Sequence, residues 1–193
     1  MSLDSLNVPA ASRRLAPVEP RWTPLFCLVL LTAACALASF ALACATPFAA
    51  FAVVAAAMLP LPSALAMLAA AWLINQAIGF DALGYPLDAT TMLWGGVILA
   101  AAVAAAAAAK LVLLLLPRST NPVALSVALI GAYAAFELVL FAATPLLGGT
   151  SDFTAAIIGR LGILNVLWLL GLVAACAVVR LLIRVGERRV LFR

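Results

Sequence analysis

Polar, charged and aromatic side chains that could bind a ligand or react with one occur in a few places along an otherwise apolar chain. Trp72, Asn75 and Gln76 are spaced so that their side chains share one face of a helix. Amides donate and accept hydrogen bonds without a charge, and an indole covers a flat apolar ring. The pattern predicts non-covalent binding of a solute that carries amides or carbonyls. The alternative is that the amides bond across helices, as they do in membrane bundles.

A polar bend, residues 81–88, follows these amides before the next apolar run begins. Asp88 stands three residues before Thr91, which is the spacing of a helix N-cap. Tyr85 lies between a glycine and a proline, as in an ordinary turn. We expect this bend to cover the site as a lid, because loops carry motion that rigid spans cannot.

Two ionisable residues interrupt the last two apolar runs. Glu137 lies eight residues before Pro145, and Arg160 lies eight residues after Asp152. At about 1.5 Å per residue both are about 12 Å deep in the membrane. A charge inside a span is costly, so we expect Glu137 and Arg160 to pair, with Tyr133 one turn from the glutamate. Such a pair either fixes the register of two helices or lines a solute cavity.

The composition indicates that these groups lie in a membrane protein, and it argues against several classes of catalytic and metal-binding site. The 193 residues are 68% hydrophobic and 9% charged. A water-soluble domain with this composition would lack the polar residues that its surface needs. The chain has no histidine, the commonest general base and metal ligand. Its four cysteines lack CxxC spacing and are interpreted as small core residues. We expect no metal site, no resident cofactor, no nucleic-acid partner and no enzyme activity; the formal charge of +4 comes from arginines near the chain ends.

The apolar runs predict an all-α integral membrane protein, a six-transmembrane-helix bundle with both termini cytoplasmic. Arginines near both ends favour the cytoplasm, so the number of spans is even. The second run is short enough for a re-entrant segment, and the first resembles a signal peptide except for its length. We expect residues 1–23 to form a polar, mostly disordered tail and residues 186–193 a basic tail. The predicted spans are about 24–45, 47–60, 62–80, 89–116, 121–145 and 152–183.

The stretch "NQAIGFDALGYPLDATTMLWG", residues 75–95, resembles the BtuM-type cobalamin transporters of Gram-negative bacteria. These are solitary relatives of the S components of energy-coupling-factor vitamin transporters. The resemblance implies a six-helix protein of the bacterial inner membrane with an outward-facing vitamin site. Members of the family can place a cysteine against the cobalt, but residues 71–95 contain none, and Cys44 is the one candidate at the right depth. The resemblance rests on size, topology and Asn75, Gln76, Gly79, Phe80, Tyr85, Pro86, Thr91, Trp94 and Gly95.

The resulting hypothesis is a vitamin uptake protein whose transported ligand is cobalamin or a related corrinoid. Its expected partners are this ligand, the lipid bilayer and an energy-coupling-factor-type membrane and ATPase module. The alternatives are an S-component-like transporter for another vitamin and an assembly or scaffold subunit without a solute. A membrane enzyme would need an acid-rich motif or a metal cluster, which the sequence lacks. The expected substrate-binding residues are Trp72, Asn75, Gln76, Phe80, Tyr85, Asp88, Thr91, Trp94, Tyr133, Glu137 and Arg160.

Overall fold

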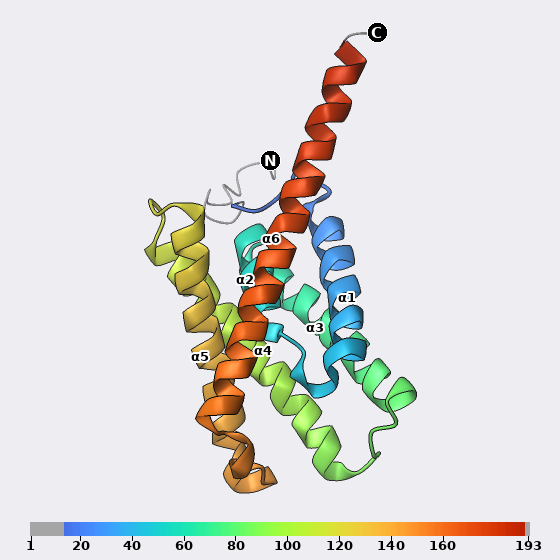
Figure 1. The fold of residues 1–193 in the computed structure, drawn as a ribbon, viewed down its shortest axis with the longest axis vertical. Coiled ribbons are helices and arrows are strands. Elements are labelled where there is room, and N and C mark those ends of the chain that lie inside the picture. Colours follow the sequence, from blue (N-terminus) through green and yellow to red (C-terminus); the bar gives the residue numbers. More distant parts are fainter. Residues whose placement is uncertain (1–13, 192–193) are drawn as a thin grey trace, which may run out of the picture.

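The computed structural model describes residues 14–191, leaving out the side chains of Cys44, Asp152 and residues 187–191. This part of the chain is helical and contains no strand, so the all-α prediction is confirmed. Successive helices run in alternating directions along the molecule (Figure 1). The helices are α1 (Thr23–Leu42), α2 (Phe48–Met58), α3 (Leu61–Ala77), α4 (Ala89–Leu115), α5 (Asn121–Leu147) and α6 (Ala155–Leu191), with short helical turns η2 (Ala43–Ala45), η3 (Ile78–Ala82) and η4 (Thr150–Asp152).

Five helical segments are long and apolar enough to cross a membrane, with 20 to 32 residues each, when α3 is taken together with η3 and α6 is taken as far as Gly186. α2 has 11 residues, which at about 1.5 Å each span only about half of a hydrocarbon core of about 30 Å. The prediction of a multi-pass helical membrane protein therefore holds. The predicted count of six spans holds only in part, because one of the six passages is made by a helix too short to cross alone.

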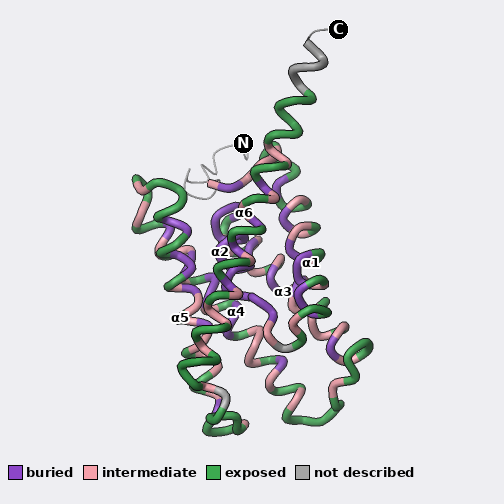
Figure 2. The backbone as a smooth tube through the Cα atoms, viewed as in Figure 1, coloured by how far each residue is buried: buried purple, intermediate pink, exposed green. Residues whose placement is uncertain are grey.

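α2 is short because it lies in the centre of the bundle and not against lipid. Every residue from Phe48 to Met58 is buried, and α2 packs against α3, α4, α5 and α6 (Figure 2). A helix that is apolar all round is typical of such a fully buried position. The first and last residues of α2 are buried as well, so other parts of the chain must satisfy the free backbone groups at its ends.

Side chains from two other helices satisfy the two ends of α2. At its N-terminus, the backbone N–H of Ala50 donates to Asn165 Oδ1 of α6 at 3.0 Å. At its C-terminus, Lys110 Nζ of α4 donates to the carbonyls of Ala56 and Leu59, at 3.1 and 2.9 Å. A cation at the C-terminal end also matches the helix dipole. Lys110 is thus a cap for a buried helix.

The helix ends differ from the predicted ends for local reasons. α5 was expected to stop at Pro145 but continues through it to Leu147. Proline lacks the N–H that would bond the carbonyl of Phe141, and the hydroxyl of Thr144 donates to that carbonyl instead, at 2.8 Å. α6 continues as a helix to Leu191, beyond the predicted end at 183 and into the predicted basic tail.

Within the predicted polar tail, residues 1–23, the structure holds residues 14–16 against the bundle, and residues 19–22 are exposed; residues 1–13 lie outside the described part. The backbone N–H of Arg14 donates to the carbonyl of Ala57 at 3.0 Å, and Leu15 is buried in the core. Backbone groups at the end of α2 need partners, and this segment supplies one.

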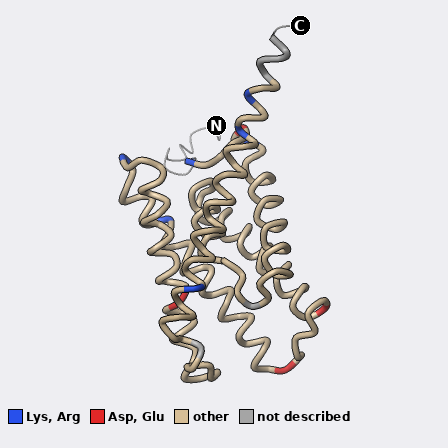
Figure 3. Tube along the Cα trace, viewed as in Figure 1, with Lys and Arg blue, Asp and Glu red and all other residues tan. Residues whose placement is uncertain are grey.

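In Figure 3, most Lys and Arg positions lie toward one end of the bundle and acidic positions lie at the opposite end, while one basic and one acidic position lie close together in this view between the two ends. We call the end that holds Arg14, Lys110 and Arg180 the basic end. The hydrogen bonds of these three side chains all lie there, at the end of α2, at the turn after α4 and at residues 15–16. We call the opposite end, with Asp81 and Asp88, the acidic end. Residues 14–16 and the C-terminal half of α6 both lie at the basic end. The sequence predicts that this end faces the cytoplasm, and that placement stays a prediction.

Candidate functional site

The predicted amides lie toward the acidic end, where α3 meets α1 and the segment that leads into α2. Asn75 Nδ2 donates to Ser39 Oγ at 2.9 Å and to Thr46 Oγ1 at 3.0 Å. Gln76 Nε2 donates to Asn75 Oδ1 at 3.2 Å. Both donor protons of Asn75 are therefore used inside the protein. Asn75 holds α1 and α3 together around Thr46, which fixes the position of its neighbour Gln76.

Trp72 and Gln76 mark a close contact between α3 and α4. Trp72 Nε1 donates to the carbonyl of Gly95 at 2.8 Å. A Cβ atom at Gly95 would lie 2.6 Å from Gln76 Oε1, so a side chain at this position would displace the Gln76 amide. Trp72 and Gln76, which the sequence places on one helix face, thus both contact Gly95 of the next helix. Trp94, the neighbour of Gly95, is half-buried on α4.

The bend at residues 81–88 is fixed at both sides. The Tyr85 backbone N–H donates to the carbonyl of Gly79 at 3.0 Å, and a Cβ atom at Gly79 would lie 2.8 Å from the tyrosine ring. The expected N-cap is confirmed, because the N–H of Thr91 donates to Asp88 Oδ1 at 2.7 Å. This backbone N–H holds the pKa of the Asp88 carboxyl below its usual range. Phe80 is half-buried beside this bend.

On the other side of the bundle, Tyr133 joins α5 to α6. Its hydroxyl donates to the carbonyl of Ile158 at 2.7 Å, and its ring lies 3.3 Å from the position of a Cβ atom at Gly162. Glu137 lies one turn further along α5 and is half-buried. Arg160 is exposed on α6.

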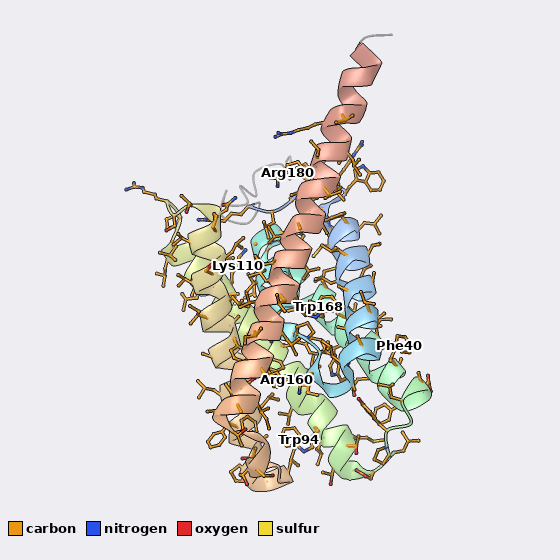
Figure 4. All side chains as sticks on the ribbon, in the orientation of Figure 1. Phe40, Trp94, Lys110, Arg160, Trp168 and Arg180 are labelled. Carbon is orange, nitrogen blue, oxygen red and sulfur yellow. The ribbon has the colours of Figure 1, made fainter. Side chains whose placement is uncertain are left out.

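The predicted Glu137–Arg160 ion pair is wrong: within the described residues, the structure contains no ion pair between them. The depth estimate did not include the angle around α6. The groove between α5 and α6 is lined by Tyr133 and by Gly159, Gly162, Ile163 and Val166 of α6. With 3.6 residues per turn, Arg160 lies roughly 100° around α6 from the middle of this row, on a flank of the helix. In the view of Figure 4, Arg160 extends from α6 toward α4, and Trp94 lies lower on α4.

Two apolar grooves run along α6. One, of about 500 Å³, lies between α1 and α6 and includes Ala33, Ala34 and Trp168. The other, of about 400 Å³, lies between α5 and α6. Of the predicted binding residues, Tyr133 alone lines either of these two grooves.

The eleven predicted residues thus fall into three groups. Trp72, Asn75 and Gln76 meet α1 and α4; Tyr85, Asp88 and Thr91 shape the bend, with Phe80 and Trp94 beside it; and Tyr133, Glu137 and Arg160 belong to α5 and α6.

The sequence interpretation missed Ser39, Thr46, Cys35 and the capping role of Asn165. Cys35 Sγ donates to the carbonyl of Ala71 at 3.1 Å, one turn from Ser39. The available signal was the occurrence of Ser39 and Thr46 in an apolar run that breaks at Pro47. Their partner Asn75 is 36 residues from Ser39, and no local spacing predicts that contact.

No metal centre emerges from the residues that the structure describes, since no three His, Cys, Asp or Glu side chains gather among them. The side chain of Cys44, the one cysteine considered as a cobalt ligand, lies outside this description. Comparisons of the chain with protein-family models, with curated proteins and with solved structures find no match.

Proposed function

We propose that this chain is a bacterial inner-membrane uptake protein that binds a vitamin, with cobalamin or a related corrinoid as the best candidate, in a cavity open at the acidic end. The observation that carries the proposal is the uneven distribution of polar groups. Toward the acidic end lie the amides of Asn75 and Gln76 and the exposed guanidinium of Arg160. At the basic end, Arg14 and Lys110 are bonded to backbone carbonyls.

The contacts divide the candidate residues by role. Asn75 uses both amide protons on α1 and the α2 entry, so it positions the wall of the cavity. Among the described residues, Trp94 and Arg160 make no such internal bond, and they are the residues we expect to touch the solute. An indole covers the flat corrin ring, and a guanidinium binds amide carbonyls or a phosphate. An arginine inside a span is a functional candidate for this reason.

The chain holds no nucleotide-binding motif. Active uptake would therefore need an energy-coupling-factor-type module or trapping of the solute inside the cell. The same residues would also serve a transporter of the S-component kind for another vitamin.

An assembly or scaffold subunit is the second candidate. It is favoured by the internal satisfaction of Asn75, whose bonds are those of a structural amide. The apolar groove between α1 and α6, with Ala33 and Ala34 on its wall, would suit the close approach of another helix. Such a protein would need no unpaired arginine in the acidic half of α6.

Growth of a cobalamin-dependent host that lacks its own inner-membrane importer tests the proposal. We expect the wild type to support growth at limiting vitamin, and Trp94→Ala and Arg160→Gln to fail while still inserted in the membrane. Phe40→Ala is the control, since Phe40 is 62% exposed on α1 and points away from α4 and α6 (Figure 4). No growth with the wild type, and no corrinoid retained on purification, would reject cobalamin. Growth with all three variants would reject this site.

A further inference from the structure

Residues 14–16, which we call the clasp, cross the basic end of the bundle. In Figure 1 this segment runs between the turn that leads into α5 and the α1–α6 side of the molecule. It has no helix or strand of its own, yet Leu15 is only 5% exposed and belongs to the core. A segment without regular structure keeps such a position only through bonds to its neighbours.

One side of the clasp is held to α2, α4 and the turn that follows α4. The Arg14 guanidinium donates to the carbonyl of Leu116 at 2.6 Å and to that of Ser119 at 3.1 Å. The Arg14 backbone N–H donates to Ala57 at the end of α2. The carbonyls at a helix C-terminus lack partners in the helix, and the planar fork of arginine reaches two of these carbonyls from one side chain.

The other side of the clasp is held to α6. Arg180 Nη2 donates to the carbonyls of Leu15 and Ala16, at 3.2 and 3.4 Å. α6 packs against α2 and, over a few residues, against α5; the Tyr133–Ile158 contact with α5 lies in its acidic half. The clasp therefore links α6 to the α4–α5 hairpin at the basic end.

We infer that the clasp is a releasable gate, which closes the basic end and must detach from the α4–α5 turn before this end opens. Its bonds run from arginine side chains to backbone carbonyls, and a carbonyl released at this surface can bond to water. Lys110 bonds to Ala56 and Leu59, so α2 stays capped when the clasp leaves. The gate rests on the proposed uptake function in one respect: a solute that enters at the acidic end has to leave past α2 and the clasp.

The test measures how often the basic end opens, without any solute. Leu59→Cys places a thiol at the end of α2, at a residue that is 2% exposed. A membrane-impermeant maleimide is added to inside-out vesicles, and the labelled peptide is quantified by mass spectrometry, so the native cysteines can remain. Leu68→Cys, at a fully buried position of α3, reports opening of the whole bundle.

We expect Arg14→Ala to raise labelling at position 59 by roughly tenfold or more, the effect of losing a hydrogen bond to a charged group, and Arg180→Ala to raise it as well. Arg21→Ala is the control, because Arg21 belongs to the same N-terminal segment but contacts Glu19 and the Trp22 ring at the surface and not the clasp. Labelling at position 68 should stay at its wild-type rate in all variants.

Equal labelling of Arg14→Ala and the wild type at position 59 would overturn the inference. A parallel rise at positions 59 and 68 would overturn it too, because the clasp would then only stabilise the whole bundle. Failure of uptake by the wild type would reject the proposed function alone, since the labelling needs no solute.

Discussion

Asn165 of α6 accepts a hydrogen bond from the backbone N–H of Ala50, 115 residues earlier in the chain, at 3.0 Å. This bond satisfies the first turn of a helix that lies wholly inside the bundle. In a soluble protein water or a neighbouring Ser or Asp commonly does this. Here the residue before α2 is Pro47, and no side chain at that position caps the helix, so a distant amide supplies the acceptor.

Asn165→Leu should destabilise the protein by about 1 to 3 kcal/mol, because it leaves a buried N–H without a partner. Melting in detergent micelles measures the loss. Leu170→Ala, at a position 61% exposed on the same helix, is the control for a change that leaves α2 untouched. If both variants melted at the wild-type temperature, the bond would not support α2.

Gly95→Ala should weaken the contact between α3 and α4. The new methyl group would lie 2.6 Å from Gln76 Oε1, so the flexible amide must move and lose its bond to Asn75, at a cost of about 1 kcal/mol. Gly96→Ala is the matched control, because nothing lies within 4 Å of its Cβ position. That variant should be neutral, or more stable by up to about 1 kcal/mol through helix propensity.

A double variant, Gly95→Ala with Gln76→Ala, separates the steric effect from other causes. If the clash is the reason for the loss, removing the amide relieves it, and the two changes are not additive. Additive losses in melting experiments would show that Gly95→Ala acts through something other than Gln76.

The cap on α4 should make stability depend on acid. The pKa of the Asp88 carboxyl is lowered by the N–H of Thr91 in the folded protein, so the cap contributes fully above the unfolded pKa of about 3.9. The contribution is lost as the pH falls through the lower, folded pKa. Asp88→Asn keeps an acceptor oxygen but cannot titrate.

Melting curves of the wild type and Asp88→Asn across this pH range measure the effect. The stability that the wild type gains from the Asp88 carboxylate should be lost below about pH 4. The control is Asp81→Asn, which changes an aspartate of the same bend that does not bond the start of α4 and should melt like the wild type. A difference between wild type and Asp88→Asn that stayed constant at every pH would contradict this assignment.

The basic end should lie in the cytoplasm, because positive loops are retained there. Fluorescent-protein fusions after residue 119 and at the C-terminus should fluoresce, and fusions after residues 86 and 149 should not. Residue 119 and the last described turns of α6 lie at the basic end of the structure. Fluorescence after residue 86 would reverse the topology and move the proposed cavity to the cytoplasmic side.

The sequence alone determined the helical class, the approximate spans and the separation of charge between the two ends. These features are local: runs of apolar residues force a backbone in lipid to bond within itself. The cap at Asp88 was readable for the same reason, since its partner Thr91 is three residues away. The shared face of Trp72, Asn75 and Gln76 also followed from helical spacing.

Only the tertiary structure decided what these side chains meet. The depths of Glu137 and Arg160 follow from counting residues. The rotation of α6 about its own axis depends on its packing against α5, where Gly162 meets Tyr133. This rotation turns Arg160 away from the α5 contact. The roles of Lys110 and Asn165 depend on α2 being buried, and Arg14 was assigned to a tail because its carbonyl partners lie 102 and 105 residues away. Apolar periodicity says that a segment avoids water; it does not distinguish lipid from the interior of the same protein, and that distinction decides which backbone ends need a distant cap.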